Sequence, residues 1–406
     1  MVAFKAGPGQ RALGQFVMDE GHSMDRTGNM RGTATNALQG ASSAGAGPAS
    51  CPQPIPVSKP MLRLDSHIDL PWPERDSHGL PATTPFETPQ PCQFSPALAR
   101  EGGLGAAVLA AYVPQGPLDT QGHGAAWARL QAQMGAIHAL ANSTGVNGSR
   151  ARGAGQATAR LCHSTNDVRA AHQVGQVAIL PALENGYALG EDMGRIATVK
   201  RKWGLTYVTL THNGHNLLGD SCVSAGLGAP AHGGLSELGR EAVRALNQAG
   251  VLVDVSHASP QAMMEALRHS TAPVIASHSA MKALHPHPRN LDDKQLLALR
   301  EQGGVVQVAA VRFFLARGQA GLGHLVAHIR HAVRLMGVGH VGISSDFDGG
   351  GGIEGWQGAD QTMAVDQALV AAGFDESERT ALWGGNFLRA LHQAQAIASP
   401  LPAAAP

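Results

Sequence analysis

The stretch SELGREAVRALNQAGVLVDVSHAS, residues 236–259, contains a helical pattern followed directly by an apolar run. Ser236 can accept a hydrogen bond from the first free backbone amides of a helix, and Gly250 is suited to end that helix. Apolar side chains recur on one face of this predicted helix at Leu238, Ala242, Val243 and Leu246. The run at 250–255 then predicts a buried strand. The stretch is therefore one helix–strand unit, and it is followed by a histidine, His257.

The same kind of unit recurs along the chain after residue 60. Short runs rich in Val, Ile and Leu predict eight strands, at 61–66, 104–112, 177–183, 205–211, 250–255, 273–277, 303–309 and 340–345. Alternating strands and helices predict a parallel sheet with right-handed crossovers. Eight such units over about 330 residues predict an α/β fold, a closed (β/α)8 TIM barrel with insertions. An open doubly wound sheet is the alternative, although no G-x-G-x-x-G follows any predicted strand.

Composition divides the chain into three parts and excludes some partners. Residues 1–60 are rich in Gly, Ala, Ser and Pro without periodicity, which predicts a low-complexity, disordered extension. Residues 61–395 would then form the barrel, and 396–406 a flexible tail. Lys+Arg and Asp+Glu number 30 each, so the net charge of zero argues against a nucleic-acid partner. No run reaches the ~18 apolar residues of a membrane span and no signal peptide is evident, so we expect a cytoplasmic protein without membrane association.

Polar residues that can bind metals follow the predicted strands in a regular way. Side chains at positions i and i+2 of a strand point the same way, so His67 and Asp69 should converge on one point. The full set at the carboxyl ends of the strands is His67, Asp69, Glu184, His212, His257, His278 and Asp346. In a (β/α)8 barrel these ends meet at one mouth, where the active sites of the fold lie.

Three histidines and two carboxylates in this set suit divalent transition metals, most obviously zinc. Five ligands exceed the needs of one tetrahedral ion, so two ions that share a bridging carboxylate, Glu184, are the simplest arrangement. Two such ions about 3.5–4 Å apart can activate a shared water, which is hydrolytic chemistry. Taken singly, each residue has an ordinary structural explanation: a hydrogen-bonded pair, a helix cap, a core histidine or an Asx-turn.

The ordered set of motifs resembles the membrane (renal) dipeptidases and their bacterial relatives, a family of zinc metallopeptidases with a (β/α)8 barrel. The resemblance runs from residue 65 to 391 and rests on DSHIDLPW, PALENGYAL, LTYVTLTHNGHN, GLSELGREAVRALNQAGVLVDVSHAS, PVIASHSAMKALHPHPRNL, GHVGISSDFDG and WGGNFLRAL. It implies a dipeptide substrate, some tolerance of a C-terminal D-residue, two zinc ions per chain and a homodimer.

The resemblance also implies a role for each residue. The ligands of one zinc would be His67, Asp69 and Glu184, and those of the other Glu184, His257 and His278. His212 would touch the substrate and help to polarise the scissile carbonyl. Arg289 would bind the substrate carboxylate, although the polar segment HPHPRNLDD by itself suggests an exposed arginine. Asp346 would take a proton from the water that bridges the two metal ions, which leaves a bridging hydroxide. It would then deliver this proton to the leaving amine.

Two other functions remain open at this point. A barrel amidohydrolase acting on N-acyl amino acids or lactams would keep the fold, but many such enzymes carry His-x-His after the first strand and a metal-bridging lysine. This sequence has His-x-Asp and Glu184 instead. An inactive metal-binding homologue would be expected to lack a ligand or Asp346, and all of these residues are present.

Overall fold

The computed structural model of the chain describes residues 60–70, 92–142, 158–224 and 228–400. The predicted extension at 1–60 lies outside these residues except for Pro60, and residues 401–406 of the predicted tail lie outside them too, so these parts stay predictions. None of the described helices is both long enough and apolar enough to cross a membrane.

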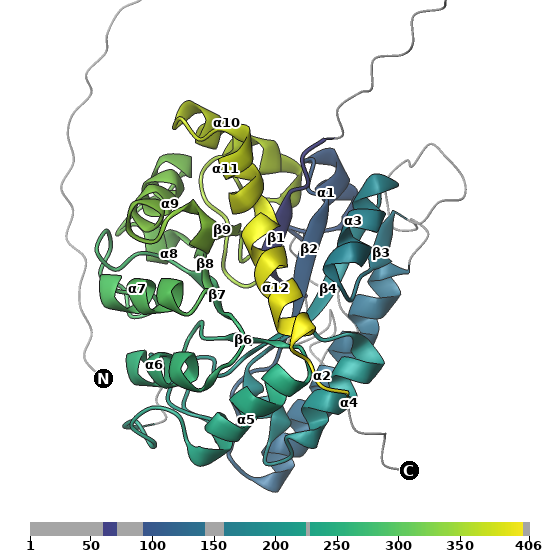
Figure 1. Cartoon of the computed structure of the whole chain (residues 1–406), viewed down its shortest axis with the longest axis vertical. Helices are drawn as coiled ribbons and strands as arrows, with labels where there is room; N and C mark the ends of the chain where they lie inside the picture. The colour runs from purple at the N-terminus through teal and green to yellow at the C-terminus, as the bar shows by residue number, and fades with distance from the viewer. Residues whose placement is uncertain (1–59, 71–91, 143–157, 225–227, 401–406) are drawn as a thin grey trace, which may run out of the picture. The chain divides into compact units, whose positions relative to one another are not determined.

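A ring of eight parallel strands forms the centre of the fold (Figure 1). In the order in which they pair, these strands are β1 (Leu64–Asp69), β2 (Ala106–Tyr112), β4 (Val177–Glu184), β5 (Tyr207–Thr209), β6 (Leu252–Asp254), β7 (Val274–Ser279), β8 (Val305–Ala309) and β9 (Val341–Ser344). Two hydrogen bonds join the last strand to the first: Asp346 N–H donates to the His67 carbonyl at 3.1 Å, and Asp69 N–H donates to the Phe347 carbonyl at 2.9 Å. The predicted (β/α)8 barrel is therefore confirmed.

Some strand limits differ from the prediction. The first strand begins at Leu64 and continues to Asp69, so His67 and Asp69 belong to the strand rather than to the loop after it. The register between β1 and β2 shifts between Asp65 and Ile68. A prediction from the alternation of apolar and polar residues does not reveal such an irregularity. A ninth strand, β3 (Ala159–Leu161), was not predicted; it pairs with β4 outside the ring and is only three residues long.

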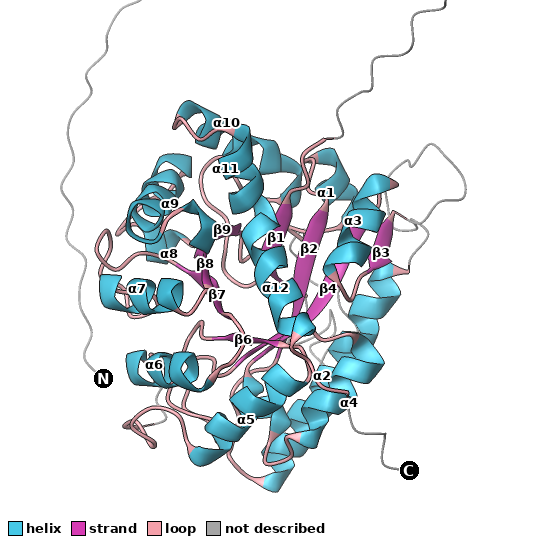
Figure 2. Ribbon diagram, in the orientation of Figure 1, coloured by secondary structure: helices cyan, strands magenta, loops and turns pink. Residues whose placement is uncertain are grey.

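Helices surround the ring, as Figure 2 shows. Those of eight residues or more are α2 (Thr120–Ala141), α3 (Thr165–Gln173), α4 (Gly194–Trp203), α5 (Glu237–Gln248), α6 (Pro260–His269), α7 (Asp293–Glu301), α9 (Leu322–Met336), α10 (Thr362–Ala371) and α12 (Asn386–Ala396). Shorter ones are α1 (Pro96–Glu101), α8 (Arg312–Leu315), α11 (Glu376–Thr380), η1 (Gly186–Leu189), η2 (Val338–His340), η3 (Ala359–Gln361) and η4 (Ala381–Gly385).

The predicted helix of the opening stretch is α5, and its ends are those that the sequence indicates. The Ser236 hydroxyl accepts a hydrogen bond from Gly239 N–H, and Gly250, with φ of 63°, follows the last turn. The apolar face of α5 that is turned toward the sheet is fully buried, at Ala242, Val243 and Leu246. This layer between helices and strands is the larger part of the core.

The interior of the ring is filled and closed at one end. Leu64, Tyr207 and Leu252 pack there with Phe387 of α12, whose ring lies edge-on to Tyr207 with centroids 6.5 Å apart. Figure 1 shows α12 lying across the ring. Since α12 packs on residues at the beginnings of the strands, the carboxyl ends are left for a site.

Candidate metal centre

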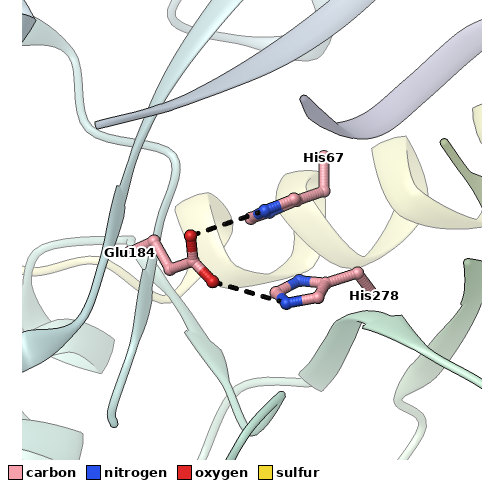
Figure 3. Close-up of side chains that lie close together, drawn as sticks. All are labelled: His67, Glu184 and His278. Atoms are coloured by element: carbon pink, nitrogen blue, oxygen red, sulfur yellow. Dashed lines mark ion pairs between the residues drawn. The ribbon is translucent and has the colours of Figure 1, made fainter. Parts of the chain in front are cut away.

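All the candidate residues from the strand ends gather around the carboxylate of Glu184, which ends β4. Its Oε1 lies 3.2 Å from Nε2 of His257, 3.4 Å from Nε2 of His278 and 3.8 Å from Nε2 of His212. Its Oε2 lies 3.7 Å from Nε2 of His67. Figure 3 shows the Glu184 carboxylate between His67 and His278. The Glu184 carboxylate therefore lies among four histidine side chains, with three Nε2 atoms near Oε1 and one near Oε2.

The remaining carboxylates lie on the His67 side of this centre. Nε2 of His67 is 3.4 Å from Oδ1 of Asp69 and 3.7 Å from Oδ1 of Asp346. Two sets of side chains have ligand atoms that all lie within 4.8 Å of one another: His67, Glu184 and His278, and Glu184, His212 and His257. The second set includes His212, which was predicted to lie at this mouth but to contact the substrate rather than to bind metal.

Each of the three predicted histidine ligands has its Nδ1 held by an oxygen atom. His67 Nδ1 lies 2.7 Å from the Tyr207 hydroxyl, which itself donates to the Ser66 carbonyl and so must accept from the imidazole. His278 Nδ1 lies 2.9 Å from the Ser277 hydroxyl, which donates to Asp254 at 2.6 Å. Nδ1 is therefore the protonated nitrogen, and Nε2 is turned toward the centre as a metal ligand requires.

His257 follows the same rule, since its Nδ1 lies 3.0 Å from Oδ1 of Asn213. The Nε2 atoms of His257 and His278 then face each other across 2.9 Å. With both Nδ1 atoms protonated, two lone pairs are opposed, and a cation between them and Glu184 would relieve the repulsion.

Unpaired polar atoms point to the same conclusion. Within the described part of the chain, Nε2 of His67 and Oδ1 of Asp69 are buried and have no hydrogen-bond partner. Buried polar atoms are nearly always satisfied, so two neighbouring exceptions call for an explanation. Imidazole nitrogens and carboxylate oxygens are among the donors that bind zinc in proteins. The residues present therefore fit a zinc centre.

Charge accumulates on the carboxylate side of the centre. Burial and the charge of Asp69 raise the pKa of Glu184 well above its usual value. Burial by itself would lower the pKa of His67, but the charges of Glu184 and Asp69 raise it to about 10. Without a metal, His67 therefore carries a proton that compensates the carboxylates, and a metal ion would displace this proton.

The pKa values of the other three histidines are shifted in the opposite direction. Burial and the guanidinium of Arg289 lower the pKa of His212 to about 3 and that of His257 well below its usual value. Burial and the charge of His67 do the same for His278. These three rings are neutral at physiological pH, which is the form that binds metals.

Unusual backbone conformations occur at the same place. His257 and Asp346 have φ values of 66° and 58°, which non-glycine residues rarely adopt. Gly349 shows a second constraint, because a Cβ atom there would lie 2.6 Å from Oδ2 of Asp69 and 2.7 Å from Oδ1 of Asp346. The segment after β9 thus needs a glycine where it passes the two carboxylates.

The loop after β5 forms hydrogen bonds with the backbone of two of the histidines, and sequence patterns did not predict these contacts. Ser221 donates its hydroxyl to the carbonyls of His212 and His257, at 3.1 Å for His257. Asp220 is buried and accepts backbone N–H groups of Ala231 and Gly234 at 2.7 and 3.0 Å. Polar residues in a predicted loop have no regular spacing, so only the folded loop reveals these contacts.

Arg289 is buried rather than exposed. Its exposed fraction is 5%, and its Nη2 donates to the His278 carbonyl at 3.0 Å. The guanidinium also lies over the ring of Phe314, 5.2 Å from the centroid. The exposed arginine suggested by the polar segment HPHPRNLDD is therefore wrong, and the substrate-binding role implied by the family resemblance stays a prediction.

A family model relates most of the chain to one family. A family model described as membrane dipeptidase (peptidase family M19) matches residues 55–405. Dipeptidase tcpJ of Claviceps purpurea (strain 20.1) is 33% identical over 242 residues, which are 59% of this chain and 56% of the relative. The match thus spans little more than half the length of this curated relative.

Solved structures show the same fold. The probable dipeptidase PvdM from Pseudomonas aeruginosa is 27% identical with a TM-score of 0.72, over 83% of this chain and 96% of that chain. A metallo peptidase from Rhodobacter sphaeroides, solved with a phosphinate mimic of the dipeptide L-Ala-D-Ala, is 22% identical with a TM-score of 0.67, over 82% of this chain and 99% of that chain. At this lower identity the second structure supports the fold alone.

Proposed function

Because the chain belongs to the membrane dipeptidase family, peptidase family M19, we propose that it is a zinc-dependent dipeptidase with two metal ions at the carboxyl end of the barrel. The observation that carries the proposal is the convergence of four histidine Nε2 atoms on one buried carboxylate, Glu184, at 3.2 to 3.8 Å. No solvated cluster of histidines would adopt this geometry around a carboxylate that is 2% exposed.

We assign the ligands as the family resemblance implies. His67, Asp69 and Glu184 would hold one ion, and Glu184, His257 and His278 the other. When bound, such a pair of ions supplies a water of lowered pKa and a Lewis acid for the scissile carbonyl. His212 is the most exposed of the four histidines, which supports the proposal that it would contact the substrate carbonyl.

Asp346 is the proposed general base and acid. Burial raises its pKa to about 7, although the positive charge of His67 works against the rise. A group with a pKa near neutrality can both accept a proton and return it, here to the leaving amine. Arg289 has buried guanidinium donors next to the centre and would pair with the carboxylate of the C-terminal residue.

Hydrolysis assays test the proposal. We would measure amino acid release from L-Ala-L-Ala and L-Ala-D-Ala with and without added zinc, for the wild type and for Asp346→Asn. The wild type should hydrolyse both substrates only with metal, and the variant should retain its zinc while kcat falls about 10²- to 10⁴-fold.

Cleavage of N-acetyl-alanine but of neither dipeptide would contradict the proposal and favour an amidohydrolase. Full activity of Asp346→Asn would remove the assigned role of this carboxylate but not the dipeptidase activity. A substrate without a free α-amino group, such as N-acetyl-Ala-Ala, is the matched control for dipeptide recognition.

A further inference from the structure

A pocket next to the metal centre has two cationic side chains in its wall. It is bounded by His257 on the side of the centre, and its polar lining includes Cys222, Lys282, Arg289, Asn290 and Gln295. None of the described residues that line this pocket is an aspartate or a glutamate. The pocket therefore presents two positive charges without an internal counter-charge, which favours anionic ligands.

Arg289 can bind one anionic group of a ligand. Its Nη2 is occupied by the His278 carbonyl, whereas its Nε is buried and has no partner among the described residues. An unsatisfied buried donor on a charged group is costly, so it is expected to be satisfied by a ligand. Under the proposed function this ligand is the α-carboxylate of the substrate.

Lys282 provides a second positive charge that the reaction itself does not use. Its backbone is fixed, because Lys282 N–H donates to the Leu291 carbonyl at 2.8 Å and Leu291 N–H donates to the Ala280 carbonyl at 2.9 Å. Its side chain is exposed, and in the described part of the chain it forms no ion pair. An ammonium group on a flexible stem above a fixed backbone can reach a ligand in the pocket.

The Cys222 thiol, which also lines the pocket, does not neutralise the two cations. Burial raises the pKa of Cys222, although the charges of Arg289 and Lys282 act in the opposite direction. The thiol is therefore neutral at physiological pH and adds no negative charge to the pocket.

From this arrangement we propose that Lys282 selects dipeptides whose C-terminal residue is acidic. The α-carboxylate binds Arg289, and the side-chain carboxylate of Asp or Glu binds Lys282, so that two anionic groups meet two cations. A neutral side chain leaves the ammonium without a partner, and a basic one is repelled. The inference rests on the proposed function and adds the substrate class to it.

The test compares an acidic substrate with its uncharged isostere. We would measure kcat/KM for L-Ala-L-Glu and L-Ala-L-Gln with the zinc-loaded wild type, Lys282→Met and Lys282→Glu. Lys202→Met is the matched control, because Lys202 is an exposed lysine on α4, at the end where that helix leads into the start of β5. The ratio of the two kcat/KM values is unaffected by a general loss of stability.

We expect the wild type and Lys202→Met to prefer the acid about two- to fivefold, the size of effect typical of an ion pair formed by an exposed side chain. Lys282→Met should bring the ratio close to one, mainly through KM, and Lys282→Glu should favour L-Ala-L-Gln. A ratio near one in the wild type, or an unchanged ratio in Lys282→Met, overturns the inference while L-Ala-L-Ala hydrolysis still supports the proposed function. If no dipeptide is hydrolysed, both fail.

Discussion

Removal of one hydroxyl group, in Ser277→Ala, should weaken zinc binding without unfolding the barrel. The Ser277 hydroxyl connects Nδ1 of His278, at 2.9 Å, with Oδ2 of Asp254, at 2.6 Å. Asp254 keeps its hydrogen bonds from the Thr209 hydroxyl and from the backbone of Ser256, so the carboxylate stays satisfied. The imidazole, in contrast, loses the group that fixes its protonated nitrogen.

The size of the effect follows from that loss. A buried N–H without an acceptor costs about 1–3 kcal/mol, and loss of an outer partner of a metal ligand typically costs 10- to 100-fold in affinity. The expected increase in the zinc Kd is therefore about 10- to 100-fold, or about 1.4–2.7 kcal/mol.

A competition titration against a chromophoric zinc chelator measures this change, with circular dichroism to confirm the fold. Thr362→Val is the control, because the Thr362 hydroxyl is equally buried but donates to the Ala359 carbonyl, at the start of α10. A zinc Kd for Ser277→Ala within twofold of that for the control would refute the argument that this hydroxyl orients His278.

Three further outcomes are expected. Gly349→Ala would place a methyl group 2.6 Å from Oδ2 of Asp69 and displace this carboxylate, so the same titration should show zinc binding at least about tenfold weaker; unchanged binding would mean that the segment moves freely. In the wild type, Nη2 of the buried Arg63 guanidinium lies 3.0 Å from Oδ2 of Asp366, and Asp366→Ala would remove this partner. This should cost about 3–5 kcal/mol and lower Tm by about 4–7 °C, and a melting curve like that of the wild type would contradict it. Finally, His67, with a pKa of about 10, is protonated at pH 8 in the metal-free protein. Zinc binding should release this proton, so the apparent affinity should fall about tenfold for each unit of decreasing pH, and calorimetry in buffers of different ionisation enthalpy should detect the proton.

The barrel and most of the site could be predicted from the alternation of strands and helices and from the polar residues that follow the strands. His212, His257 and Asp346 each follow a strand by two or three residues, and parallel strands bring such positions to one mouth. This regularity is what separates them from the many other histidines of the sequence. The candidate ligands therefore did not depend on knowing the exact strand limits, which were wrong by several residues for β1.

The groups that orient the ligands could not be predicted in this way. Tyr207 lies 140 positions from His67 and occurs in an apolar run, where a tyrosine is expected in the core. Asn213 lies 44 positions from His257, in a loop without periodicity. These contacts depend on the register of the closed ring and on the path of the loop, and neither is encoded in local patterns.

The most direct test of the central claim is the amount of zinc bound per chain. Purified protein, saturated with zinc and then dialysed against metal-free buffer, would be analysed by inductively coupled plasma mass spectrometry alongside Glu184→Ala. The account predicts two zinc ions per chain in the wild type and a loss of both when the bridging carboxylate is removed. One zinc ion or none in the wild type would contradict a paired metal centre.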